Sequence, residues 1–240
     1  MQKMVWAVLS VVLCVSPMSA DAPRNAKEAP NSSVVSDQAR STTRLRGRIV
    51  DADTGKPTPA RLYIQSADGR WFRARTQSPE GSAVEYRKQR PPTSVENHTT
   101  LSAHPFVADL PAGRYTITVE RGKEYAPAVR TFRVGETPID VTIPLRRWIN
   151  VAERGWYSGD THVHRSVAEL PNVMLAEDLN VALPLTYWVT KSHMPPGQGA
   201  KTEVDESHVR LIQVDSTHVI YPVNTEYEIF SVGKERHTLG

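Results

Sequence analysis

Short alternating runs between residues 45 and 143 constrain the fold most strongly. Apolar and polar side chains alternate in five runs separated by glycine, proline or aspartate: 45–50, 60–64, 113–119, 131–134 and 139–143. A period of two is typical of strands that bury one face. The segment 76–105 is polar and contains proline and glycine, so it is predicted to be a long loop. Because nothing in this region has a helical period, the sequence predicts an all-β sandwich.

The first 22 residues have the features of a secretory signal peptide. A positive charge precedes a short apolar run, Met4–Val15, and Ala20 and Ala22 supply the small residues of a cleavage site. The run is shorter than the roughly 20 residues that cross a bilayer, so no membrane span is expected. Residues 23–42 are rich in Ala, Pro, Asn, Ser and charged residues and are predicted to be a disordered linker.

The remaining composition agrees with export. The only cysteine, Cys14, lies inside the signal, so the mature chain has no disulfides. Leu13 stands where a lipoprotein signal has a small residue, so lipidation is not expected. The formal net charge is only +3, which gives no reason to expect a nucleic-acid partner. We expect an exported bacterial protein, either periplasmic or secreted.

Two histidines at alternate positions mark a candidate metal site in the last third of the chain. Six of the eight histidines lie after residue 160. If residues 161–164 are extended, His162 and His164 share one face and can hold one divalent ion together. Asp160, directly before them, is expected to orient the ligands rather than to bind the ion.

The region after Trp148 predicts strands together with a helix. A short helix is expected within 172–180, with Pro171 in its first turn and Asn180 near its end. The strands expected after it are 181–186, 209–214, 218–221 and 226–230. Strand, helix and strand in this order are typical of an α/β domain.

Three segments of the first region carry a resemblance to a known family: Gly47–Asp51, Thr54–Leu62 and Leu110–Ile117. Together they resemble the carboxypeptidase regulatory-like, or transthyretin-like, β-sandwich over residues 43–148. The resemblance implies an accessory module without catalytic residues. His98 and His104, in the predicted loop, are accordingly expected to be surface histidines.

Three motifs in the last third carry a second resemblance: Gly159–His164, Asn224–Glu226 and His237–Gly240. In this order they resemble the metal motifs of the PHP metallohydrolases, the polymerase and histidinol phosphatase superfamily. A sandwich placed ahead of them is similar to the CehA/McbA-type branch of exported enzymes. The resemblance implies a multi-domain chain, in which the all-β sandwich is followed at 149–240 by the N-terminal part of an α/β, PHP-type distorted barrel.

The resemblance also implies a role for each site residue. His162 and His164 would hold one ion, Glu226 would bridge two ions, and His237 would hold the second. Asp160 and Glu226 are the candidate catalytic residues. Zn, Mn or Fe suits this mixture of imidazole and carboxylate, with two ions expected in a longer parent.

The function expected from these roles is metal-dependent hydrolysis. A metal-activated water would cleave a phosphoester, ester or carbamate of a small-molecule substrate. If Glu226 does not bridge, Glu228 on the same strand face is the alternative. The oligomeric state is not predicted.

Two departures from the family pattern limit this expectation. Leu185–Trp188 stands where the family usually has Asp-His, and the chain ends inside the expected barrel. The domain at 149–240 is therefore expected to be incomplete, with weak or no activity in the 240-residue chain. An alternative stays open, namely a non-catalytic extracellular or periplasmic binding module built on the sandwich, with a remnant hydrolase half-domain.

The other notable side chains in this region are given ordinary roles. Surface or pocket positions are expected for three further histidines: His193, His208 and His218. Asp215 is expected to be a solvated charge. The core or a pocket wall is expected for three aromatic residues: Trp156, Tyr187 and Trp188.

Overall fold

The computed structural model describes residues 41–89, 95–189, 197–198, 210–227, 230–232 and 234–237. The predicted signal peptide and all but the last two residues of the predicted linker lie outside this range. Residues 39–240 form one compact unit. Among the described residues, no helix combines the length and the hydrophobicity that a bilayer span requires.

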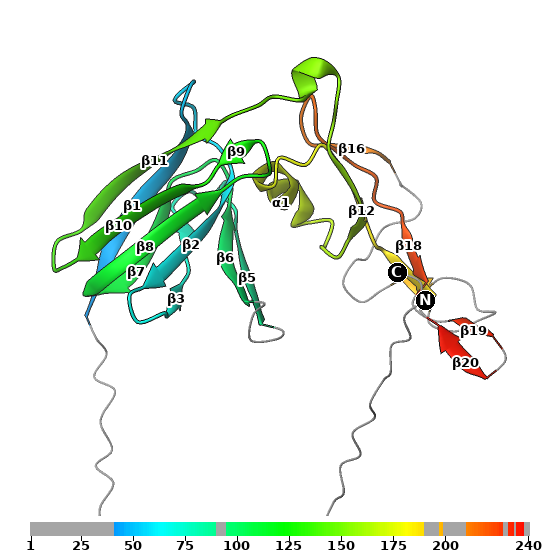
Figure 1. The fold of residues 1–240 in the computed structure, drawn as a ribbon, viewed down its shortest axis with the longest axis horizontal. Coiled ribbons are helices and arrows are strands. Elements are labelled where there is room, and N and C mark those ends of the chain that lie inside the picture. The colour runs from blue at the N-terminus through cyan, green and yellow to red at the C-terminus, as the bar shows by residue number, and fades with distance from the viewer. Residues whose placement is uncertain are drawn as a thin grey trace, which may run out of the picture. The chain divides into compact units, whose positions relative to one another are not determined.

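The first region folds as the predicted β-sandwich (Figure 1). One sheet has the strand order β4-β7-β1-β11-β9, and the other has the order β10-β8-β2-β6-β5, with β3 paired to β2. The bounds are β1 (Thr42–Asp51), β2 (Ala60–Ser66), β3 (Trp71–Phe72), β4 (Arg75–Thr76), β5 (Ala83–Gln89), β6 (Val95–Leu101), β7 (Phe106–Pro111), β8 (Gly113–Glu120), β9 (Tyr125–Ala126), β10 (Ala128–Val134) and β11 (Ile139–Arg147).

The alternating sequence of the strands builds the core between the two sheets. In β8, Tyr115, Ile117 and Val119 are buried while the residues between them are more exposed. Burying each large apolar side chain contributes about 1.5–3 kcal/mol. A Cβ at Gly47 would lie 2.2 Å from the Phe106 ring, so only glycine fits that point of β1. The predicted sandwich is therefore confirmed.

The predicted loop at 76–105 is wrong, because strands β5 and β6 lie within it and pair with each other. The register runs from Ala83 opposite Leu101 to Gln89 opposite Val95, and β6 also pairs with β2. The polar sequence did not indicate burial, yet Thr99 and Thr100 are buried. The helix α1 packs over β6, and Asn172 Nδ2 donates a hydrogen bond to the carbonyl of Thr100 at 3.1 Å.

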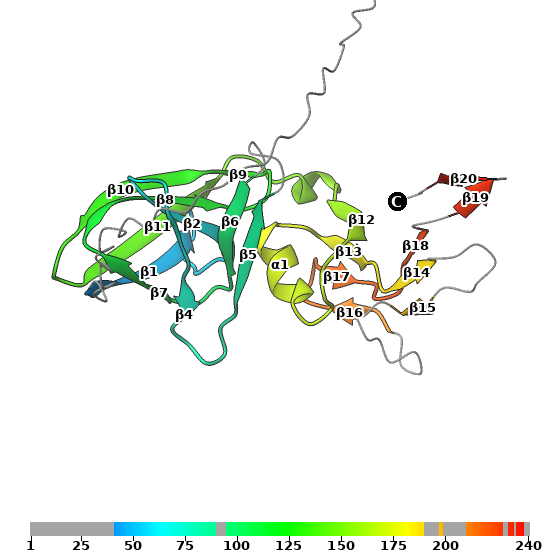
Figure 2. The ribbon, with the colours of Figure 1, turned by 90° about the horizontal axis from the view of Figure 1, so that it is seen from below.

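The residues from Gly159 onward, called here the C-terminal module, begin with a strand–helix–strand unit (Figure 2). Strands β12, β13 and β17 are parallel neighbours, β16 adds an antiparallel edge, and α1 connects β12 to β13. The elements are β12 (Gly159–Val163), α1 (Leu170–Ala176), β13 (Val181–Pro184), β14 (Tyr187–Val189), β15 (Gly197–Gln198), β16 (Ile212–Gln213), β17 (Val219–Ile220), β18 (Thr225–Tyr227), β19 (Phe230–Val232) and β20 (Glu235–His237). A 3-10 turn at Ala152–Arg154 precedes them.

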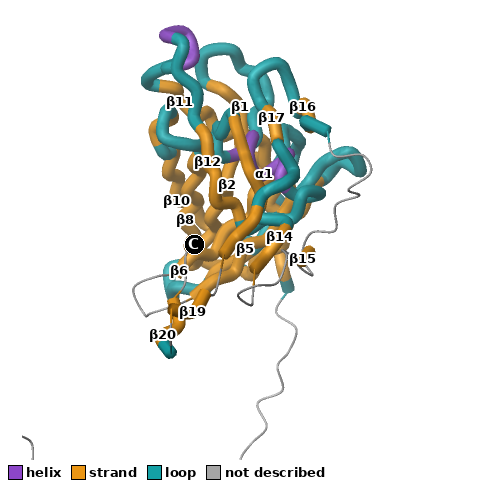
Figure 3. The backbone as a smooth tube through the Cα atoms, turned by 90° about the vertical axis from the view of Figure 1, so that its right-hand side faces the viewer, coloured by secondary structure: helices purple, strands orange, loops and turns teal. Residues whose placement is uncertain are grey.

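This module contains the strand, helix and strand that the sequence predicts. Val163, Leu170, Met174, Ala182 and Ile220 form its small apolar core. Its described strands lie in separate sheets of four, three and two strands rather than in a closed barrel. Strands predominate throughout the described chain (Figure 3).

The helix α1 ends at Ala176, four residues before the predicted end. Asp178 takes a left-handed conformation, with φ 54°, and the N–H of Leu179 bonds to the carbonyl of Met174 at 2.9 Å. This pattern is a helix stop that usually employs glycine. An aspartate occupies it because its carboxylate binds both Arg121 and Arg147 at 2.8 Å.

Candidate metal centre

The site lies where parallel strands of the C-terminal module end. Strand β12, which pairs in parallel with β13, ends at Val163. After β13 the chain continues into β14, and after β17, the parallel neighbour of β13, it continues into β18. Strands β14 and β18 also pair in parallel. Asn224 ties the strand ends together, because its side-chain amide donates to the carbonyl of Thr161 at 2.7 Å. Carboxyl ends of parallel strands are where α/β proteins commonly place ligands.

Three predicted ligands converge at this edge: His162, His164 and Glu226. The two imidazole Nε2 atoms are 3.1 Å apart. One Glu226 carboxylate oxygen lies 3.7 Å from His162 Nε2, and the other lies 3.5 Å from His164 Nε2. The histidines are exposed, whereas the Glu226 side chain is only 12 % exposed.

These separations suit one divalent cation. Zinc bonds nitrogen and oxygen ligands at about 2.0–2.2 Å, which places tetrahedral ligand atoms roughly 3.3–3.6 Å apart. The three observed separations bracket that value without any rearrangement of the backbone. Imidazole with carboxylate is also the donor set expected for Zn, Mn or Fe. The residues present therefore fit a metal ion.

Trp188 supports Glu226 and was not predicted to do so. Its indole Nε1–H donates to the Glu226 carboxylate at 3.0 Å, because Trp188 and Glu226 are opposite each other in the β14–β18 pair. Such a bond fixes the orientation of a ligating carboxylate. The only signal in the sequence was Trp188 itself, in the segment 185–188.

Asp160 is not one of the converging ligands. Its carboxylate instead accepts a hydrogen bond from the backbone N–H of His162 at 2.8 Å, a contact of the kind that an orienting role requires. His237 belongs to β20, opposite Phe230, but its side chain lies outside the description. Glu228, His193 and His208 also lie outside the described residues.

Two further sequence predictions are corrected here. His218, expected at a surface or pocket position, is buried, and its Nδ1 lies 2.8 Å from the carboxylate of Asp215, which is exposed as predicted. Burial raises the pKa of Asp215, but hydrogen bonds from Thr217 and His218 outweigh this and lower it overall. Trp156, expected in the core or a pocket wall, is 73 % exposed.

A cleft of about 450 Å³ adjoins the metal cluster. Its lining includes His162 and His164 and, from the sandwich, Tyr86 and His98. The prediction that His98 is a surface residue is wrong, because it is only 3 % exposed and its ring lies 5.2 Å from those of both Tyr63 and Tyr86. His104 is half-buried, with Nδ1 2.9 Å from Ser102 Oγ.

We expect His98→Phe to reduce the loss of stability at acidic pH. Burial, followed by the charges of Arg61, Arg165 and Arg73, lowers the pKa of His98 from 6.5 to about 4. The unfolded chain therefore binds more protons between these values, so stability is complete above pH 6.5 and falls as pH drops towards 4. Phenylalanine keeps the ring contacts without titrating, so it removes a loss of unfolding free energy of about 3 kcal/mol between pH 6.5 and 4.

Urea unfolding of both proteins at pH 7.5 and at several values down to 4 measures this effect. The carboxylates titrate equally in both proteins. The difference between the two curves of unfolding free energy against pH therefore isolates the titration of His98. Parallel curves over the whole range would contradict the assignment.

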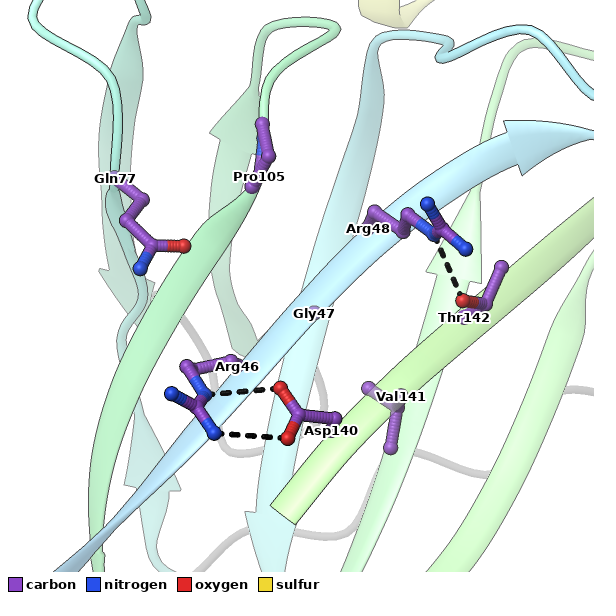
Figure 4. A pocket seen from close by; sticks show the side chains of 8 residues that line it. All are labelled: Arg46, Gly47, Arg48, Gln77, Pro105, Asp140, Val141 and Thr142. Carbon is purple, nitrogen blue, oxygen red and sulfur yellow. Dashed lines mark hydrogen bonds and ion pairs between the residues drawn. The ribbon is translucent and has the colours of Figure 1, made fainter. Parts of the chain in front are cut away.

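A second hollow, of about 520 Å³, lies on the exposed face of the sandwich (Figure 4). Arg46 lines it and binds Asp140 through two hydrogen bonds of 2.9 Å, while Arg48 Nε donates to Thr142 at 3.0 Å. Arg46 is thus paired with the one carboxylate of the lining, and the hollow brings together no candidate metal ligands. We assign it no chemistry.

The comparisons with known proteins do not identify the chain. No protein-family model matches the sequence, and no curated protein matches it. Among solved structures, it is similar to a mutant of the shaft pilin spaA from Lactobacillus rhamnosus GG, with 14 % identity and a TM-score of 0.30 over 46 % of this chain. The match covers 52 % of the pilin chain. A likeness this low carries no argument about function.

Proposed function

We propose that this protein is an exported, metal-dependent hydrolase of PHP type that acts on a small molecule. The observation that carries the proposal is the convergence of His162, His164 and Glu226 within 4.8 Å of one another. Glu226 is more than 60 positions from the two histidines in the sequence, yet the three residues present a donor set that suits a catalytic divalent ion.

Each residue of the site has a part in this proposal. His162, His164 and Glu226 bind one ion, Trp188 holds the Glu226 carboxylate, and Asp160 holds the backbone of His162. When bound, the ion would supply Lewis acidity and an activated water for hydrolysis of a phosphoester, ester or carbamate. The role of His237 as a ligand of a second ion remains a prediction.

The finer fold and the location belong to the same proposal. The β12–α1–β13 unit and its parallel neighbour β17 are what the opening of a PHP-type α/β barrel would contain. The volume of the adjoining cleft, about 450 Å³, is within the usual range for small-molecule sites. Export depends on the predicted signal peptide, residues 1–22.

Metal loading and hydrolysis test the proposal. The purified chain is incubated with Zn²⁺ or Mn²⁺, desalted and assayed for metal by elemental analysis and for turnover of 4-nitrophenyl acetate and 4-nitrophenyl phosphate. We expect about one tightly bound ion per chain and at most weak turnover, which a chelator abolishes. Glu226→Gln should weaken metal binding at least about 100-fold. Losing a residue that only hydrogen-bonds to a ligand already costs roughly 10- to 100-fold, and Glu226 is itself a proposed ligand.

Glu136→Gln is the matched control, because Glu136 is an exposed glutamate of the sandwich. A wild-type chain that binds no metal would overturn the hydrolase proposal and leave the binding module as the better description. Equal metal affinity in the Glu226 and Glu136 variants would overturn the assignment of Glu226.

A further inference from the structure

The cleft beside the metal cluster is lined by both parts of the chain. His162, His164 and Arg165 line it from the C-terminal module, and Tyr86 and Lys88 line it from strand β5 of the sandwich. A substrate held at the cluster would therefore extend towards side chains of the sandwich. This arrangement departs from the expectation that the sandwich is a mere accessory.

Two cations in this cleft lie close to the same aromatic ring. The guanidinium carbon of Arg165 lies 4.5 Å from the centroid of Tyr86, and Nζ of Lys88 lies 5.8 Å from it. Among the described residues, the nearest carboxylate oxygen paired with Arg165 belongs to Glu169, at 4.0 Å. Lys88 has no ion-pair partner among the residues that the structure describes. Contacts with a ring leave guanidinium and ammonium N–H donors able to bind an anion.

The carboxylates of the cleft, in contrast, already have partners. Glu96 and Glu177 both lie near Arg61, at 3.6 and 3.3 Å, and share it with Glu120 at 3.0 Å. The Asp160 carboxylate accepts the N–H of His162. Among the described lining residues, Lys88 and Arg165 are thus the cations that no carboxylate oxygen approaches more closely than 4.0 Å.

We propose that Arg165 and Lys88 bind an anionic group of the substrate, such as a carboxylate or a sulfate, that is separate from the bond being cleaved. This inference rests on the proposed function for its placement of the scissile bond at His162, His164 and Glu226. Tyr86 positions both cations, so strand β5 of the sandwich takes part in substrate selection. The preferred substrates are anionic esters or carbamates rather than neutral ones.

Binding of sulfate and benzoate to the metal-free protein tests the anion site without any need for catalysis. Nuclear magnetic resonance titrations in the presence of a chelator compare the wild type with Lys88→Gln, Arg165→Gln and Arg87→Gln. The first two variants are expected to bind each anion roughly tenfold more weakly, the effect of losing one hydrogen bond to a charged group. Arg87→Gln is the control, since Arg87 pairs with Glu85 and does not line the cleft.

A second measurement uses the metal-loaded protein and a matched pair of esters. The ratio of kcat/KM for 4-carboxyphenyl acetate to that for neutral 4-carbamoylphenyl acetate should fall about tenfold in Lys88→Gln and Arg165→Gln, and Lys88→Arg should restore it. Unchanged anion binding in both glutamine variants would overturn the inference, as would a wild type that binds neither anion. If anion binding is lost in the variants but the wild type holds no metal, the proposed function fails while the anion site stands.

Discussion

Replacing His162 and His164 together by alanine is expected to reduce bound divalent metal from about one ion per chain to less than about a tenth. The two imidazoles supply two of the three converging ligand atoms, and Glu226 alone cannot hold an ion against solvent or a chelator. Elemental analysis after desalting measures the stoichiometry. Added Zn²⁺ should also raise the melting temperature of the wild type but not that of the double variant, because only a ligand that binds the folded state stabilises it.

The control for this experiment is His104→Ala. His104 is a half-buried histidine of the sandwich whose Nδ1 contacts Ser102, and it does not belong to the cluster. It should leave both the metal content and the response to Zn²⁺ unchanged. A double variant that retains the wild-type metal content would place the ion elsewhere and remove the basis for the hydrolase.

Replacing Asp178 by alanine is expected to cost 3–5 kcal/mol of unfolding free energy, about the cost of breaking a buried ion pair. The carboxylate binds Arg121 and Arg147, and the side chains of Asp178 and Arg121 are both 9 % exposed. Without Asp178, the buried Arg121 would lack its carboxylate partner. A Cβ at Gly122 would lie 2.5 Å from the carbonyl oxygen of Glu177, so the backbones here are too close to relax easily.

Urea unfolding at pH 7 measures this loss, and two further variants separate its causes. Asp178→Asn removes the charge but tolerates the left-handed backbone, so it should retain most of the destabilisation. Asp140→Asn breaks the pair of Arg46 and Asp140, which are 46 and 69 % exposed, and should cost at most about 1 kcal/mol. Similar losses for the Asp178 and Asp140 variants would show that the buried network contributes little.

Local patterns predicted a large part of the fold. Alternation in segments such as 113–119 predicted strands correctly, because burying every second side chain is a property of the strand itself. It failed at 76–105, where polar Thr99, Thr100 and His98 are buried under elements far away in the sequence. The end of α1, predicted near Asn180, was also misplaced. Asp178 takes a left-handed conformation that usually needs glycine, and its ion pairs with two distant arginines offset the strain.

The candidate site divides in the same way. The sequence alone determined that His162 and His164 share a face, since their spacing matches the period of a strand, and it singled out Glu226 by motif order. Only the tertiary structure decided that Glu226 lies 3.5–3.7 Å from both imidazoles, with Trp188 bonded to it, because that depends on parallel pairing of β14 with β18. The cleft that Tyr86 and Lys88 share with the cluster is also a tertiary feature, since it requires contact between segments more than 70 residues apart.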